Sequence, residues 1–201
     1  MSADTYFTIS GASEGLFKNK GSRFLAFAFP VKDENEAKDY VQILKKQYHN
    51  ARHHCYAYRI GTEEPYMIRM NDDGEPSGTA GKPIFGQILS KQLTNILIVV
   101  VRYFGGTLLG TSGLIKAYKA AAENALMNST IKQNVLKEKL HLHFGYQEMN
   151  AVMSVVKEES VEITQQDFQE ECNMDISVPR KVKDSVLRRL MLIEKLNISE
   201  V

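Results

Sequence analysis

The spacing of apolar residues changes several times along the first two thirds of the chain, and each change predicts an element. Residues 34–48 carry apolar side chains at helical spacing behind a capping-box pair, Asp33 and Glu36, and predict a helix. A second helix is expected to begin with Thr79 as its N-cap, and a third over 113–127, where small residues fill the apolar face. Strands are expected at 23–29, 54–60, 66–70 and 95–104, with short strands or an extended arm at 5–12 and 14–19.

One of these strands differs from the others. The run NILIVVVRYF, from Asn95 to Phe104, is apolar at consecutive positions, which predicts a strand buried on both faces. An acidic turn-rich segment, DDGEPSG, precedes it, and a glycine-rich segment, GGTLLGTSGL, follows it. Two segments rich in turn residues and hydroxyl groups thus flank the most apolar strand of the chain. We expect the functional site between 72 and 114.

The hydrophobic period restarts after a polar stretch at 128–134. We therefore place a domain boundary near 134, which gives an N-terminal domain over 1–134 and a C-terminal domain over 135–201. The second domain is predicted to contain, in order, strand 138–144, helix 146–158, strand 161–167, strand 170–178, helix 179–192 and a short strand near 196–199. This βαββαβ order is the ferredoxin-like arrangement, and the whole chain is predicted to have an α+β fold.

Charge and cysteine content narrow the class of protein. Residues 1–134 carry 16 Lys and Arg against 12 Asp and Glu, whereas residues 135–201 carry 9 against 12, so the first domain is mildly biased toward an anionic partner. The only cysteines, Cys55 and Cys172, fall in different domains, which argues against a disulfide framework and favours a reducing compartment. The sequence shows neither a signal peptide nor a membrane span, and we expect a cytoplasmic protein.

The glycine-rich segment has the order strand, turn, helix, which can form an anion cradle at the helix N-terminus. Gly105 and Gly110 match the glycines of a P-loop, but Thr111 and Ser112 stand where that motif requires Lys and Ser or Thr. The spacing therefore does not support a nucleotide-hydrolysing P-loop. A sharp strand-to-helix turn explains the glycines equally well.

Arg102 ends the apolar strand and needs a partner for its charge. That partner is either a carboxylate of the acidic segment or an external phosphate, and an internal ion pair is the simpler alternative.

The acidic residues Asp72, Asp73 and Glu75 could ligate Mg²⁺ or act as acid and base, although they lack EF-hand spacing and suit a solvated turn. His53 and Cys55 would share one face of a strand and both can ligate zinc, but no second ligand cluster follows. We assign no metal, no cofactor and no catalytic residue.

Four motifs carry a family resemblance. SRF at 22–24, HHCYAYRIG at 53–61, DDGEPSGTAGKP at 72–83 and VVVRYFGGTLLGTSGLIKAY at 99–118 closely resemble the IMPACT/YigZ family, and residues 135–201 look like the extra domain of its bacterial members. The resemblance implies an N-terminal domain like domain IV of elongation factor G, followed by a ferredoxin-like domain similar to domain V. It also implies a link to translation, which eukaryotic members regulate, and action of bacterial members on ribosomes or RNA.

These observations lead to one functional hypothesis and two alternatives. We expect a translation-related regulatory or binding protein that contacts RNA or the ribosome through the two loops. The first alternative is a Mg²⁺-dependent phosphate-handling or hydrolytic enzyme that uses the acidic loop, and the second is a protein partner bound by the C-terminal sheet. The expected phosphate-binding residues are Lys82, Arg102, Gly105, Gly106, Thr107, Gly110, Thr111 and Ser112, beside the acidic loop of Asp72, Asp73 and Glu75.

Overall fold

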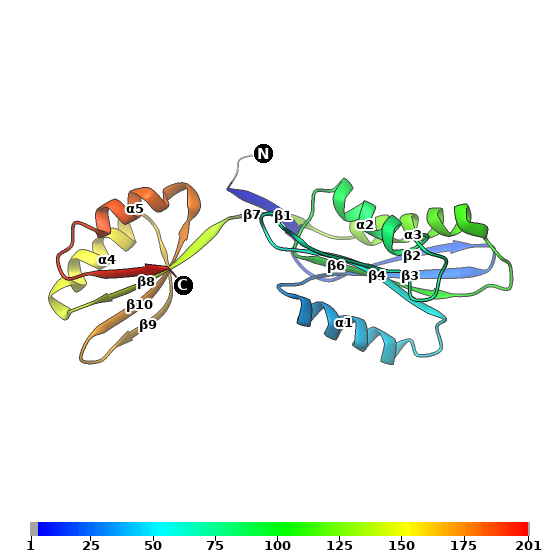
Figure 1. Cartoon of the computed structure of the whole chain (residues 1–201), viewed down its shortest axis with the longest axis horizontal. Coiled ribbons are helices and arrows are strands. Elements are labelled where there is room, and N and C mark those ends of the chain that lie inside the picture. Colours follow the sequence, from blue (N-terminus) through cyan, green and yellow to red (C-terminus); the bar gives the residue numbers. More distant parts are fainter. Residues whose placement is uncertain (1–3, 201) are drawn as a thin grey trace. The chain divides into compact units, whose positions relative to one another are not determined.

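The computed structural model of the protein, which describes residues 4–200, contains two compact units (Figure 1). The first comprises Tyr6–Asn134, and the second comprises the chain from Val135 onward together with the described residues before Tyr6. Each unit has a hydrophobic core of its own. Among the described residues, no helix is long and apolar enough to cross a membrane.

The first unit is built on a five-stranded antiparallel sheet. Its strands lie in the order β2-β3-β6-β4-β5, so the apolar strand β6 is central. Side chains of β6 are fully buried from Ile96 to Val101, as the continuous apolar pattern predicted. The strands are β2 (Ser13–Asn19), β3 (Ser22–Pro30), β4 (His53–Ile60), β5 (Met67–Asn71) and β6 (Ile96–Tyr103).

Helices cover both faces of this sheet. Helix α1 (Glu34–Gln47) lies on one face, and α2 (Gly81–Ser90) and α3 (Gly110–Met127) lie on the other (Figure 1). Alternation along β6 divides its side chains between the two cores: Leu97, Val99 and Val101 pack with α1, while Ile98 and Val100 pack with α2 and α3. The same period of two directs Arg102, the next position in the second series, toward the α3 side.

The starts of α1 and α2 illustrate one correct and one wrong local prediction. Asp33 caps α1 and accepts hydrogen bonds from the backbone N–H groups of Asn35 and Glu36, at 2.8 and 2.9 Å. Thr79 does not cap α2, because its hydroxyl donates to the Pro76 carbonyl at 2.6 Å and the N-cap position falls on Ala80. The cap of α2 comes instead from the acidic loop, as described below.

Two further strands join distant parts of the sequence. Strand β1 (Thr5–Ile9) pairs with β7 (Ile131–Val135) in a two-stranded sheet, and the Ser10 N–H donates to the Thr130 carbonyl at 2.9 Å. The strand at β7 was not predicted, since the centre of the strand is polar and its residues are mostly exposed. Its pairing partner lies more than 120 positions away, where no local pattern can indicate it.

The second unit has the predicted ferredoxin-like topology. Its antiparallel sheet has the order β11-β8-β10-β9, and apolar side chains of β8 and β10 pack against the two helices. The short last strand does form, as β11. The elements are β8 (Lys137–Phe144), η1 (Tyr146–Glu148), α4 (Met149–Glu158), β9 (Glu162–Phe168), β10 (Cys172–Pro179), η2 (Arg180–Val182), α5 (Lys183–Leu190) and β11 (Asn197–Glu200).

Candidate functional site

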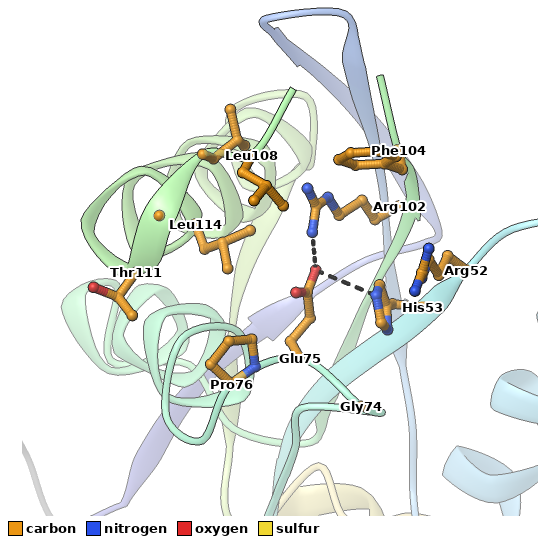
Figure 2. Close-up of a pocket in the computed structure, with 12 residues that line it drawn as sticks. Arg52, His53, Gly74, Glu75, Pro76, Arg102, Phe104, Leu108, Thr111 and Leu114 are labelled. Carbon is orange, nitrogen blue, oxygen red and sulfur yellow. Dashed lines mark hydrogen bonds and ion pairs between the residues drawn. The ribbon is translucent and has the colours of Figure 1, made fainter. Parts of the chain in front are cut away.

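A cavity of about 390 Å³ opens in the first unit where β6 ends and α3 begins (Figure 2). The start of β4 and the acidic loop after β5 complete its walls, so both segments that flank β6 in the sequence contribute to it. We call it the Arg102 cavity. It is lined by Arg52, His53, Gly74, Glu75, Pro76, Arg102, Phe104, Leu108, Leu109, Gly110, Thr111 and Leu114.

The register of the sheet sets the floor of the cavity. Arg102 on β6 lies opposite His53 on β4 and opposite Phe24 on β3. Directly opposed residues of antiparallel strands share a face, so these three side chains all lie on the α3 side. The Arg102 guanidinium carbon lies 5.4 Å from the centre of the Phe24 ring, on β3, and 5.7 Å from that of Phe104, in the loop after β6.

Arg102 is paired inside the protein. One terminal nitrogen, Nη1, donates to Oε1 of Glu75 at 2.6 Å, and the two side chains are only 6% and 4% exposed. The Tyr118 hydroxyl of α3 donates to the same oxygen at 2.8 Å. Nε of Arg102 is buried and has no hydrogen-bond partner among the residues that the structure describes. The guanidinium is thus neutralised but only partly satisfied, an arrangement that favours a further acceptor.

Two groups beneath this ion pair, the Cys55 thiol and the Tyr118 hydroxyl, keep their protons. The Cys55 thiol donates to the Asp72 carbonyl at 2.9 Å and to the Tyr118 hydroxyl at 3.3 Å. Burial raises the pKa of the Cys55 thiol and also that of the Tyr118 hydroxyl. Cys55 therefore stays a neutral thiol rather than a nucleophile, and Tyr118 serves as a fixed donor to Glu75.

His53 turns one ring nitrogen toward the ion pair. Its Nδ1 lies 2.8 Å from the Asp73 carbonyl, which can only accept, so Nδ1 carries a proton. In the neutral ring Nε2 then presents a lone pair, 3.9 Å from Oε1 of Glu75 (Figure 2). Two acceptors facing each other at this distance leave room for a donor supplied from outside.

The three carboxylates of the acidic loop serve three different purposes. Asp72 caps α2, because its side chain accepts from the N–H groups of Gly78, Ala80 and Gly81 at 2.8–2.9 Å. Asp73 pairs with Lys45 at 3.0 Å and accepts from the His54 N–H at 2.7 Å. Only Glu75 faces the cavity. In the described part of the chain, no three His, Cys, Asp or Glu side chains are grouped so that they could hold a metal ion.

The start of α3 forms the far wall. Helix α3 spans 18 residues, has no side-chain hydrogen bond at its N-cap position Leu109 and has no acidic residue in its first turn. Its first N–H groups and the positive end of its dipole are therefore available to an anion at the mouth of the cavity. Gly106 and Gly110, with φ of +85° and +69°, allow the sharp approach to this helix.

Gly105 has a structural role instead. A Cβ built on it would lie 1.9 Å from the carbonyl carbon of Gly21, in the turn between β2 and β3. Its N–H donates to the Ser22 hydroxyl at 3.1 Å. A glycine is thus required here for the close approach of two backbones, whether or not a ligand binds.

The structure brings together only some of the expected site residues. Arg102, Gly110, Thr111 and Glu75 line the cavity, whereas Lys82, Thr107 and Ser112 are exposed and do not. The lining also includes Arg52, His53, Phe104 and Leu108, which the sequence interpretation did not include among the expected site residues. A signal was present for Phe104, which lies two positions after Arg102 and so shares its face of the strand, whereas His53 reaches the cavity through the register between β4 and β6.

Comparison with known proteins identifies related chains. The Impact N-terminal domain model matches residues 20–126. The chain is 34% identical over 177 residues to the IMPACT family member YvyE of Bacillus subtilis (strain 168), covering 88% of this chain and 81% of the relative. It is 32% identical over 161 residues to the IMPACT family member YigZ of Escherichia coli (strain K12), covering 80% and 79%.

A solved structure supports the same relationship. A crystal structure described as that of a hypothetical protein superposes with a TM-score of 0.75 at 27% identity and covers 98% of both chains. Together with the domain match over more than half of the sequence, these similarities confirm the resemblance seen in the four motifs. The chain belongs to the IMPACT family.

Proposed function

We propose that this chain is a translation-related regulatory protein that contacts single-stranded RNA, free or within the ribosome, at the Arg102 cavity. The link to translation rests on the family resemblance. The contact with RNA rests on one observation above all: Arg102 is buried, lines an open cavity and gives only part of its guanidinium donor capacity to Glu75. A buried, partly satisfied cation at an open cavity is an arrangement that ligands complete.

The ion pair favours a phosphate contact at the mouth of the cavity over one at its floor. Glu75 neutralises Arg102, and its carboxylate would repel a phosphate brought to the floor. At the mouth, Arg52 and Thr111 are exposed, and the first turn of α3 has no side-chain cap. Arginine, hydroxyl groups and helix N-termini are the usual contacts to RNA phosphate.

The enzyme alternative receives no comparable support. A Mg²⁺-dependent hydrolase would need carboxylates that converge on one ion. The side chains of Asp72 and Asp73 are instead held by the start of α2 and by Lys45 with the His54 backbone, and only Glu75 reaches the cavity. The geometry therefore favours binding over catalysis.

A salt titration with matched variants tests the proposal. A fluorescein-labelled single-stranded RNA should bind, and log K should fall linearly with log salt. Arg52→Ala should weaken binding and reduce the slope by about 0.7, the value for one phosphate contact of a single strand. Thr111→Glu should weaken binding while leaving α3 intact, because an acidic residue in a first helical turn is favourable to the helix.

Lys46→Ala is the matched control, since it removes one exposed positive charge from α1, on the opposite face of the sheet. It should leave both affinity and slope unchanged. Absence of RNA binding at low salt, or equal losses for Arg52→Ala and Lys46→Ala, would contradict the proposed contact.

A further inference from the structure

We infer that the floor of the Arg102 cavity holds one unpaired guanine base, read by Glu75, His53 and Arg102. The inference deepens the proposed function, since the base would belong to the bound RNA, but the same chemistry would also accept a free guanine nucleotide. It rests on the charge of the floor, the positions of its donors and acceptors, and the apolar walls above them.

The floor is complementary to a neutral polar group. The Arg102–Glu75 pair carries no net charge, and both side chains are more than nine-tenths buried. An anion would gain from Arg102 and lose to Glu75 in the same small space. A planar base edge that offers donors and acceptors side by side satisfies both members of the pair without bringing a charge into the protein.

Each polar atom of the floor has a defined direction. Oε1 of Glu75 already accepts from Arg102 and Tyr118, whereas its second oxygen points away from Arg102, on the side of Leu114 (Figure 2). That oxygen and Nε2 of His53 are two acceptors. Arg102 lines the cavity and gives one N–H of Nη1 to Glu75, so the other N–H groups of the guanidinium make it the donor.

A set of two acceptors and one donor matches guanine better than the other bases. The Watson–Crick edge of guanine presents two donors, N1–H and the N2 amino group, next to the O6 acceptor. Adenine and cytosine present one amino group on that edge, and uracil presents a single N–H. A site with buried polar groups rejects a base that leaves one of them unpaired.

The walls fit the faces of a base. Phe104 is 43% exposed and Leu108 is 84% exposed, although both line the cavity. Unpaired bases stack on such aromatic and apolar surfaces. The volume of about 390 Å³ lies within the roughly 300–1,000 Å³ of small-molecule sites. The phosphate attached to the base would then lie at the mouth, near Arg52 and Thr111.

The first experiment varies the ligand and leaves the full chain unchanged. Affinities are measured for GMP, AMP, CMP and UMP, and for uridine hexamers that carry one central G, A, C or U. Guanine should be preferred at least tenfold in both series. Inosine in place of guanine should lose about tenfold, the cost of one missing hydrogen bond to a charged acceptor, whereas 7-deazaguanine should bind as guanine does.

The outcomes separate this inference from the proposed function. If all hexamers bind alike, the guanine site is refuted and RNA contact stands. If GMP binds with the stated preference and no hexamer binds, the guanine site stands for a free nucleotide and RNA contact is refuted. If neither series binds, both are refuted. Equal affinity for inosine and guanine would also overturn the assignment of Glu75 and His53.

A protein variant provides the second arm. Glu75→Gln keeps an acceptor for Arg102 and Tyr118 but replaces the open carboxylate oxygen with an amide donor. It should reduce the preference for guanine to less than twofold, with folding checked by circular dichroism. Unchanged guanine preference in a folded Glu75→Gln protein would refute the role of Glu75.

Discussion

Replacing Arg102 by methionine tests the buried ion pair on which the site depends. Methionine keeps much of the side-chain length and can still pack between Phe24 and Phe104, so the loss reports mainly on charge. Glu75, 4% exposed, would then be a buried carboxylate with Tyr118 as its remaining donor. Breaking a buried pair by removing one partner costs about 3–5 kcal/mol, and the Tyr118 bond places this site toward the lower end.

This cost can be converted into observables. For a unit of the size of Tyr6–Asn134, about 3 kcal/mol corresponds to a fall in Tm of roughly 10 °C. The double variant Arg102→Met with Glu75→Gln removes the unpaired charge and should recover most of the loss, because a buried pair is often neutral relative to a well-packed uncharged replacement. Both variants and the single variant Glu75→Gln are compared with the parent protein by urea unfolding.

Unfolding is followed by circular dichroism and tyrosine fluorescence, since the chain has 9 tyrosines and no tryptophan. Transitions that differ between probes would mean that the two units unfold separately, and the transition of the first unit is then the one analysed. A loss below about 1 kcal/mol for Arg102→Met would refute the buried pair. So would a double variant whose loss equals the sum of the single losses, since coupled partners must deviate from additivity.

Three other predictions concern the same unit. Burial lowers the pKa of His54 below 6.5 despite Asp73 nearby, so the ring binds a proton at higher pH in the unfolded state than in the folded state. The free energy of unfolding is therefore at its full value above pH 6.5 and falls as the pH drops through the folded pKa. His54→Gln should flatten this fall, measured as urea midpoints across the pH range. Gly105→Ala should cost about 3 kcal/mol or more through its backbone clash, whereas Gly106→Ala, in open space at positive φ, should cost about 1 kcal/mol in the same assay. Asp72→Ala should lower the free energy of unfolding by about 2 kcal/mol and increase hydrogen exchange at the start of α2, because it removes the cap. Thr79→Ala should cost less than half as much, because the Thr79 hydroxyl bonds to the Pro76 carbonyl and does not cap the helix.

Local periodicity was sufficient to predict most of the helices and strands. The continuous apolar run predicted a central strand, the capping pair predicted the start of α1, and the order of periods after 134 predicted the ferredoxin-like unit. These features depend on neighbours within a few positions, and the side-chain period of a helix or strand is set by its own backbone geometry. The same reasoning placed the expected site at the two ends of β6, where the cavity lies, and recognised that Arg102 needed a partner.

The tertiary structure decided which residues meet. Glu75 rather than Asp72 or Asp73 pairs with Arg102, because the other two carboxylates are held by helix α2 and by Lys45. The sequence alone did not distinguish which of the three acidic residues would pair with Arg102. Arg52 and His53 reach the cavity through the register between β4 and β6, two strands separated by more than 30 positions in the sequence. Such contacts are fixed by packing and loop closure over the whole unit, so the sequence could indicate the kinds of groups at the site while only the fold determined their pairing.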